Sequence, residues 1–119
     1  MRSERVRDAI IDIIDIIDNI DAAQHFTAGM TFETFMADQR TVYAVIRCLE
    51  IISEASRRLD PETKLRNPHI PWQSIANVGN VYRHPYHKVE LDLVWAAVQE
   101  RLGEVRHACI AERDAFSAS

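Results

Sequence analysis

Apolar residues at helical spacing run through almost the whole chain, and this pattern restricts the fold more than any other feature. In the first segment the large aliphatic residues lie three or four positions apart: Val6, Ile10, Ile13, Ile17 and Ile20. This spacing places them on one face of a helix. Four aspartates fall between them and are predicted to form the opposite, solvated face: Asp8, Asp12, Asp15 and Asp18.

The apolar face of this first helix is unusually wide. Ala9, Ile14 and Ile16 broaden it to roughly 160° of the helix circumference. Because isoleucine is a poor helix former, burial must stabilise the segment. So wide a face predicts contact with two neighbouring helices, or with one helix and a second subunit.

The same periodicity recurs along the rest of the chain. The segment 37–59 is expected to form a long helix with seven residues on its buried face: Val42, Val45, Cys48, Leu49, Ile52, Ala55 and Leu59. Thr31 is expected to cap a preceding short helix. Pro71 would occupy the first position of a medium helix, Pro85 would end it, and the last long helix would begin near Leu91.

No alternating strand pattern and no internal repeat interrupt these helices. We therefore predict an all-α, up-and-down antiparallel bundle of three long helices and shorter ones. The length of 119 residues suits one domain. We place this domain at residues 1–110 and expect residues 111–119 to fray.

Composition restricts the environment and the partners. The net charge of −4 does not suggest a protein that binds bulk polyanions, although a local basic patch remains possible. Cys48 and Cys109 lie in apolar helical patterns, which favours reduced, buried thiols over a disulfide. Without a membrane-length apolar run of about 20 residues or a signal peptide, the chain is expected to be cytoplasmic and not to contact a membrane.

Polar and aromatic residues gather in the stretch NVGNVYRHPYHKVELD, residues 77–92. Here His84 and Tyr86 flank the helix-breaking Pro85. A histidine at this place can act as general acid or base, and Arg83 is a permanent cation. The local set can bind a phosphodiester without a metal: Arg83, His84, Tyr86, His87 and Lys88. The alternative is that His84 and Tyr86 only cap and staple the helix end.

Other kinds of site fit the sequence less well. His84 and His87 form an H-x-x-H pair, and Glu90 or Asp92 could add ligands, but no cysteine is nearby and we expect no metal or cofactor. A helix-turn-helix at 61–83 would place tryptophan and isoleucine where base-reading residues are needed.

Two blocks of the chain resemble a known family. The stretches TFETFMADQRTVYAVIRCLEIISEASRRL and NPHIPWQSIANVGNVYRHPYHKVELDLVWAAVQERL are similar to the second and third blocks of the HepT-like branch of the HEPN superfamily. The resemblance covers roughly Ser3 to Val105. The family's signature is R-x4-H-x-Y, and His84 and Tyr86 fill its last two positions. Asn80 also fits what the family often shows.

The resemblance implies an all-α homodimer that acts as a metal-independent endoribonuclease. Such proteins are toxins paired with a minimal nucleotidyltransferase antitoxin, which can attach AMP to the motif tyrosine, here Tyr86. It also implies that RNA or the partner contacts the residues around the motif: Asn80, Tyr86, His87 and Lys88. The dimer interface is expected to use part of the first helix or the 79–87 region.

The chain departs from the signature at one position. Gly79 stands where the family has arginine. Arg83 follows four residues later, so on a helix it would share the face of Gly79 and can replace the missing cation. Two functions therefore stay open: an RNA-cleaving toxin with His84 and Arg83 as catalytic residues, or a non-catalytic partner of a nucleotidyltransferase.

Overall fold

The computed structural model describes the backbone of residues 2–78 and 88–118, and the side chains of residues 8–78 and 90–118. Every element in these ranges is helical, which confirms the all-α prediction. The elements follow in this order: α1 (Arg2–Thr27), α2 (Phe32–Ala37), α3 (Gln39–Arg58), α4 (Pro61–Arg66), α5 (Trp72–Asn77), α6 (Lys88–Ala96), the π-helical turn η2 (Ala97–Arg101) and α7 (Leu102–Ala118).

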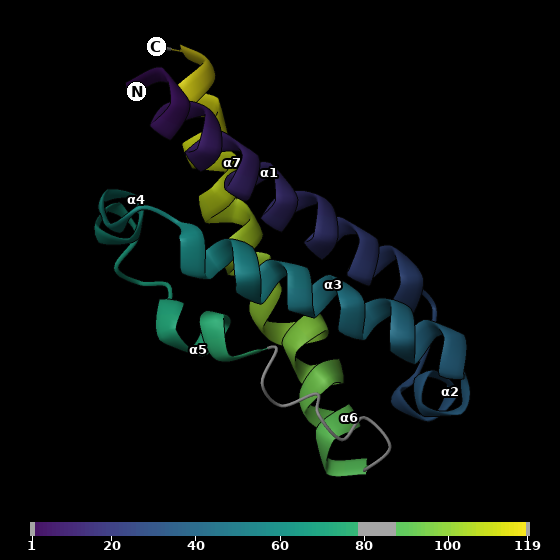
Figure 1. Ribbon diagram of the computed structural model, residues 1–119. Helices are drawn as coiled ribbons and strands as arrows, with labels where there is room; N and C mark the ends of the chain where they lie inside the picture. Colours follow the sequence, from purple (N-terminus) through teal and green to yellow (C-terminus); the bar gives the residue numbers. More distant parts are fainter. Residues whose placement is uncertain (1, 79–87, 119) are drawn as a thin grey trace.

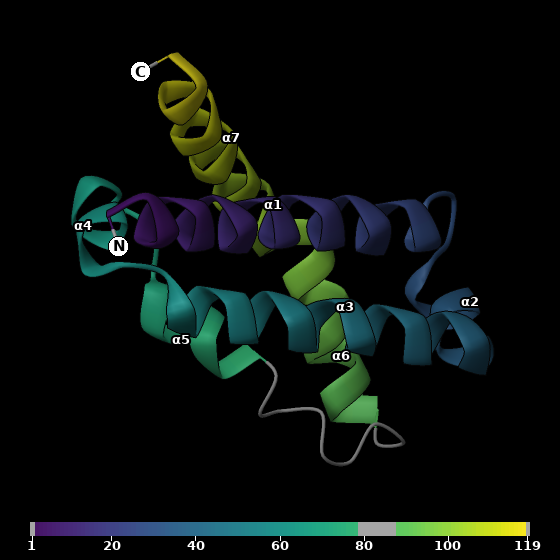
Figure 2. The same cartoon turned by 45° about the horizontal axis from the view of Figure 1, so that its top comes forward.

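Three long helical stretches dominate the molecule. Helices α1 and α3 lie side by side and run in opposite directions (Figure 1). Elements α6, η2 and α7 follow one another without a break and run across both of them (Figures 1 and 2). The short helices α4 and α5 connect α3 to this third stretch.

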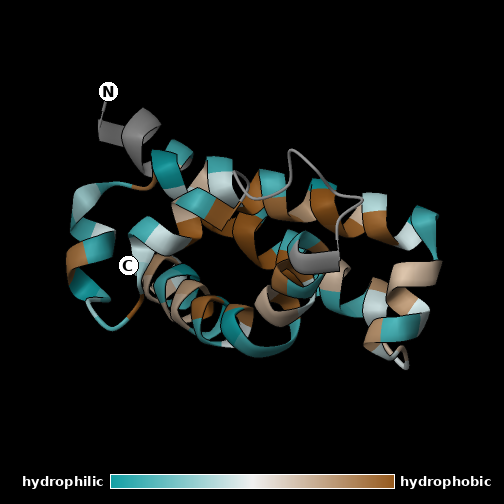
Figure 3. Cartoon of the chain, turned by 90° about the horizontal axis from the view of Figure 1, so that it is seen from below, coloured by the Kyte–Doolittle hydropathy of each residue, from teal (hydrophilic) through white to brown (hydrophobic). Residues whose placement is uncertain are grey.

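The core lies where these three stretches meet. The ribbon coloured by hydropathy shows hydrophobic segments of the long helices in this region (Figure 3). Each of the seven residues predicted for the buried face of 37–59 is buried, so that prediction is confirmed. Burying one such aliphatic side chain contributes about 1.5–3 kcal/mol.

Four residues of the apolar face predicted for α1 are buried: Ile13, Ile16, Ile17 and Ile20. Two positions differ from the prediction. Ile14 is 39% exposed, and Asp12, predicted to be solvated, is only 6% exposed. The carboxylate of Asp12 accepts a hydrogen bond of 3.0 Å from Nε of Arg58, and this pairing makes its burial tolerable. Periodicity alone could not identify this partner on another helix.

The helix starts follow local chemistry that the sequence indicates. Thr31 caps α2 in a capping box that is closed by the side chain of Thr34. Gly29 ahead of it has a φ of 77°, in the left-handed region that suits glycine. Asp60 caps α4, and Pro61 occupies its first turn.

Several boundaries differ from the predicted ones. Pro71 is the N-cap of α5 rather than its first residue, and α6 begins at Lys88 rather than near Leu91. Helix α7 continues to Ala118, past the residue 110 at which we ended the domain. One reason is Glu112, which accepts hydrogen bonds from Arg66 at 2.7 Å and so ties this end of α7 to α4.

Both cysteines are free and buried, as predicted. Burial is the main cause that raises the pKa of the Cys109 thiol to about 12, so this thiol stays protonated at neutral pH.

None of the helices that the structure describes is long and apolar enough to cross a membrane.

Candidate functional site

The residues that the sequence singles out lie mostly outside the described part of the chain. These are Gly79, Asn80, Arg83, His84, Tyr86 and His87. Lys88 begins α6, but its side chain is outside the described residues too. What the structure does describe is the frame on either side of them, formed by the end of α5 and the start of α6.

Both halves of this frame are packed on the core. Helix α5 packs against α3, and α6 packs against α2 and α3. Ile75 and Val78 are buried at the end of α5, and Leu91 and Val94 are buried at the start of α6. The described chain on either side of residues 79–87 is therefore anchored by packed helices, α5 before and α6 after (Figure 2).

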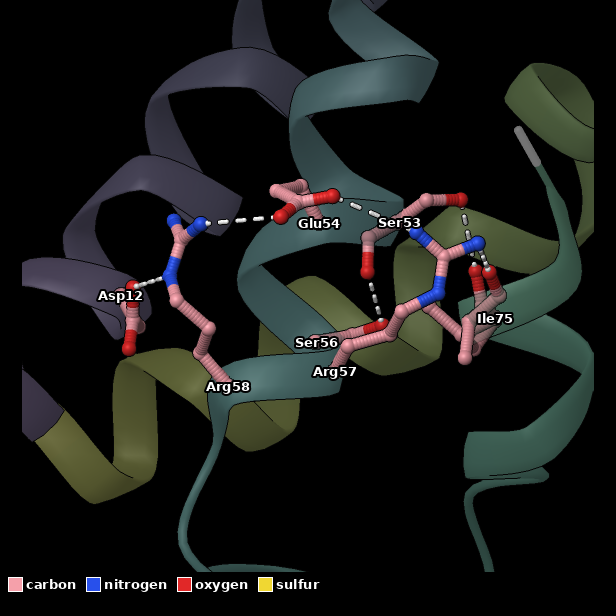
Figure 4. A network of polar contacts seen from close by, with 8 residues as sticks. Asp12, Ser53, Glu54, Ser56, Arg57, Arg58 and Ile75 are labelled. Atoms are coloured by element: carbon pink, nitrogen blue, oxygen red, sulfur yellow. Dashed lines mark hydrogen bonds and ion pairs between the residues drawn. The ribbon is translucent and has the colours of Figure 1, made fainter.

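Two side chains of α3 hold the end of α5. The hydroxyl of Ser53 donates a hydrogen bond of 3.1 Å to the carbonyl oxygen of Ile75. The guanidinium of Arg57 donates one of 2.6 Å to the carbonyl oxygen of Ala76. The carbonyl oxygen of Ile75 also accepts a hydrogen bond from the N–H of Val78, the C-cap of α5, so Ser53 adds a second donor to it. We call Ser53 and Arg57 the α3 clamp (Figure 4).

An ionic network extends the clamp across three helices. Glu54 accepts from Arg57 at 3.3 Å and from the neighbouring Arg58 at 3.4 Å. Arg58 in turn contacts Asp12 of α1 at 3.0 Å. Arg57 thus points toward α5 and Arg58 toward α1, although the two arginines are adjacent in the sequence (Figure 4).

Sequence reasoning missed this network. In the sequence, Arg57 and Arg58 are recognisable only as cations in the last turn of a helix, where they favour the negative end of its dipole. The spacing of Ser53 and Arg57 does place them on one helix face. Their acceptors, however, are backbone carbonyls, which every residue carries, so no sequence signal identifies them.

An open groove of about 450 Å³ runs along the same face of α3. Its described lining comes entirely from that helix: Arg47, Glu50, Ile51, Ser53, Glu54, Arg57 and Arg58. Glutamates lie among the arginines, and Asp12 contacts Arg58 as well. The described walls of this groove therefore carry mixed charge rather than a uniform positive field.

The start of α6 contributes an acidic group to the frame. Glu90 lies in the first turn of α6, where the positive end of the helix dipole favours a carboxylate. One of its oxygens, Oε2, is buried and has no hydrogen-bond partner among the described residues. Glu90 therefore offers an acceptor in the first turn of α6.

Comparisons with known proteins identify the family. The model of the ribonuclease HepT-like family matches residues 16–111. A probable ribonuclease HepT of Thermococcus cleftensis is 36% identical over 92 residues, which cover 77% of this chain and 84% of the relative. A putative RNase of Methanocaldococcus jannaschii is 31% identical over 84% of this chain and 83% of its own.

A more distant relative agrees with these two. A putative RNase of Caldanaerobacter subterraneus is 31% identical over 65% of this chain and 69% of its own length. No solved structure gives a significant match. The family expected from the two sequence blocks is confirmed: the chain belongs to the HepT-like ribonucleases.

Proposed function

We propose that the protein is a metal-independent endoribonuclease, with His84 as general acid/base and Arg83 as the cation that binds the scissile phosphate. The observation that carries the proposal is the family match over residues 16–111, together with relatives named as ribonucleases. The sequence supports it further, because His84 and Tyr86 occupy the last two positions of the R-x4-H-x-Y signature.

Cleavage without a metal needs two groups. A base must accept the proton of the RNA 2′-hydroxyl as its oxygen attacks the phosphorus, and the 5′-oxygen of the next nucleotide then leaves with a proton. A cation must stabilise the charge that develops on the phosphate. A neutral imidazole, the major form above a pKa of about 6.5, suits the first role, and the guanidinium of Arg83 suits the second.

The proposal includes a partner that regulates the activity in the cytoplasm. A minimal nucleotidyltransferase antitoxin would transfer AMP from ATP to the hydroxyl of Tyr86 and release pyrophosphate. The bulk and charge of the added AMP would then block RNA at the same residues. The resemblance to toxin–antitoxin pairs supports this part. Co-expression with a cognate minimal nucleotidyltransferase should add AMP to the wild type and not to Tyr86→Phe, as read by intact mass.

A second copy of the chain completes the proposal. Ile11 and Ile14 lie one turn apart on α1 and are 48% and 39% exposed. Paired exposed isoleucines favour a partner on this face, and a two-fold dimer would use the same face of both copies. Light scattering should therefore give about twice the mass of 13.7 kDa. A monomer at all concentrations would contradict the dimer.

A second function is favoured by one specific observation. Gly79 occupies the signature arginine position, and loss of such a transition-state contact costs roughly 100- to 1000-fold in rate. The protein would then bind its nucleotidyltransferase without cleaving RNA. Both functions use the same residues, so only an activity assay separates them.

The test is RNA cleavage by the purified protein with and without EDTA. The proposal expects cleavage that EDTA does not change, that His84→Ala abolishes and that Arg83→Ala lowers to a similar degree. Gly79→Arg should raise the rate or rescue Arg83→Ala. If the wild type is inert and Gly79→Arg gains cleavage, the protein is a decayed nuclease that is retained as a binding partner.

A further inference from the structure

We propose that the α3 clamp, Ser53 and Arg57, positions the catalytic segment by fixing the last turn of α5. The inference rests on the proposed ribonuclease activity, because it assigns the clamp a role in the rate of that reaction. Neither residue belongs to the family signature.

The geometry of the clamp restrains the end of α5 in two ways. Ser53 and Arg57 are four residues apart, so they project from the same face of α3. Their acceptors are the carbonyl oxygens of two consecutive residues. The Ser53 hydroxyl lies 3.1 Å from that of Ile75, and the Arg57 guanidinium lies 2.6 Å from that of Ala76. One contact would allow the helix end to rotate about it. Two contacts on neighbouring carbonyls fix both its position and its rotation.

The clamp is itself firmly held. Ser53 is 1% exposed, and its own carbonyl accepts a hydrogen bond of 2.9 Å from the hydroxyl of Ser56. The guanidinium of Arg57 is also bound by Glu54. Beneath the clamp, Ile75 is 1% exposed and anchors α5 to the core. Ser53 therefore has little freedom to follow α5 if it shifts, and Glu54 helps to orient the more exposed Arg57.

Helix α5 depends on such outside contacts. It has six residues, which is too short for a helix to be stable alone. Its N-cap, Pro71, makes no side-chain capping bond. Apolar packing holds the helix against the core but is not directional, whereas hydrogen bonds to its carbonyls are. The orientation of its last turn is therefore set largely by α3.

A small shift at this point should affect catalysis. Ala76 precedes Gly79 by three residues, and His84 follows five residues later. A misplacement of about 1 Å in a catalytic group can cost on the order of 100-fold in rate. Loss of the clamp is thus expected to lower kcat while leaving RNA binding nearly unchanged.

Arg58 provides a matched control. It is adjacent to Arg57, shares Glu54 as a partner and has a similarly exposed side chain, 50% against 42%. It contacts Asp12 of α1, however, and not α5. A substitution of Arg58 therefore disturbs the same network without releasing the carbonyl of Ala76.

The experiment compares steady-state RNA cleavage by the full chain and four variants: Arg57→Gln, Arg57→Lys, Ser53→Ala and Arg58→Gln. Rates are normalised to the folded fraction measured by circular dichroism. We expect Arg57→Gln to lower kcat at least 10-fold with KM within about threefold, and Ser53→Ala to lower it less. Arg57→Lys should recover part of kcat, because an ammonium can still donate to Ala76. Arg58→Gln should stay within twofold of the wild type.

The inference is overturned if Arg57→Gln and Arg58→Gln have the same kcat, or if Arg57→Lys is no better than Arg57→Gln. In either case wild-type cleavage would still support the proposed function. If the wild type does not cleave RNA, the proposed function fails, and the clamp is tested by hydrogen exchange over residues 72–90. Faster exchange in Arg57→Gln, absent in Arg58→Gln and partly reversed in Arg57→Lys, would support it. Equal exchange in all three variants would overturn it.

Discussion

Helix α3 is held in two different ways on its two sides. Toward the core it buries aliphatic side chains such as Leu49 and Ile52, which are fully inaccessible. Toward α5 it offers the polar contacts of Ser53 and Arg57 to backbone carbonyls. The apolar packing on the first side is non-directional and determines whether the chain folds. The hydrogen bonds on the second side are directional and determine where a neighbouring helix ends.

The largest expected effect lies on the apolar side. Ile52→Ala removes a fully buried side chain and should lower the free energy of unfolding by about 2–5 kcal/mol. Urea unfolding followed by circular dichroism measures the change. RNA cleavage per folded molecule should change little, because this residue is not part of the α3 clamp. A loss of less than about 1 kcal/mol would show that the core is looser than the packing indicates.

The ionic contact between α3 and α1 should have an intermediate effect. Arg58→Gln leaves the buried carboxylate of Asp12 without its guanidinium partner. Because Arg58 is half exposed, we expect a loss of about 1 kcal/mol rather than the larger cost of a fully buried pair. The double variant with Asp12→Asn should recover part of this loss in the same urea experiment. With Asp12→Asn measured alone as well, a loss in the double variant that equals the sum of the two single losses would exclude a coupling between the two residues.

A smaller, pH-dependent effect is expected where α4 meets α7. The hydrogen bond from Arg66 lowers the pKa of Glu112 below its usual range. The folded protein therefore keeps this carboxylate charged at a lower pH than the unfolded chain does. The resulting stability is fully present above the unfolded pKa of about 4.3 and is lost as the pH falls through the folded pKa.

Glu112→Gln provides the measurement for this effect. At pH 7 the wild type should be more stable than the variant by less than about 1 kcal/mol, because the pair is partly exposed to solvent. The difference should shrink as the pH is lowered toward 3. A difference that grows on acidification would contradict the assigned role of Arg66.

The smallest effect is expected at a side chain that belongs neither to the apolar core nor to the α3 clamp. Leu65 on α4 is 77% exposed. Leu65→Ser should change the free energy of unfolding by no more than about 0.5 kcal/mol and leave RNA cleavage unchanged. A clear loss of cleavage or of dimer mass would identify Leu65 as part of an interface that the described chain does not indicate.

The two sides of α3 also mark the limit of prediction from sequence. Its apolar face was predicted residue by residue, because burial follows the helical period. Most of the buried face of α1 was predicted in the same way, but the burial of Asp12 was not, since its partner Arg58 lies far away in the sequence. The clamp could not be predicted at all, because its acceptors are backbone carbonyls. The signature residues His84 and Tyr86 came from the family resemblance, and they remain a prediction because they lie outside the described residues.

The most direct test of the account is the identity of the RNA ends that the protein produces. Attack by the 2′-hydroxyl, with His84 as base and no metal, predicts a 2′,3′-cyclic phosphate on one product and a 5′-hydroxyl on the other. A substrate with a single 2′-deoxynucleotide at the cleaved position should then resist cleavage, and EDTA should change nothing. Mass spectrometry of the products decides between the outcomes. Products that carry 5′-phosphates, or cleavage of the deoxy-substituted RNA, would contradict the account.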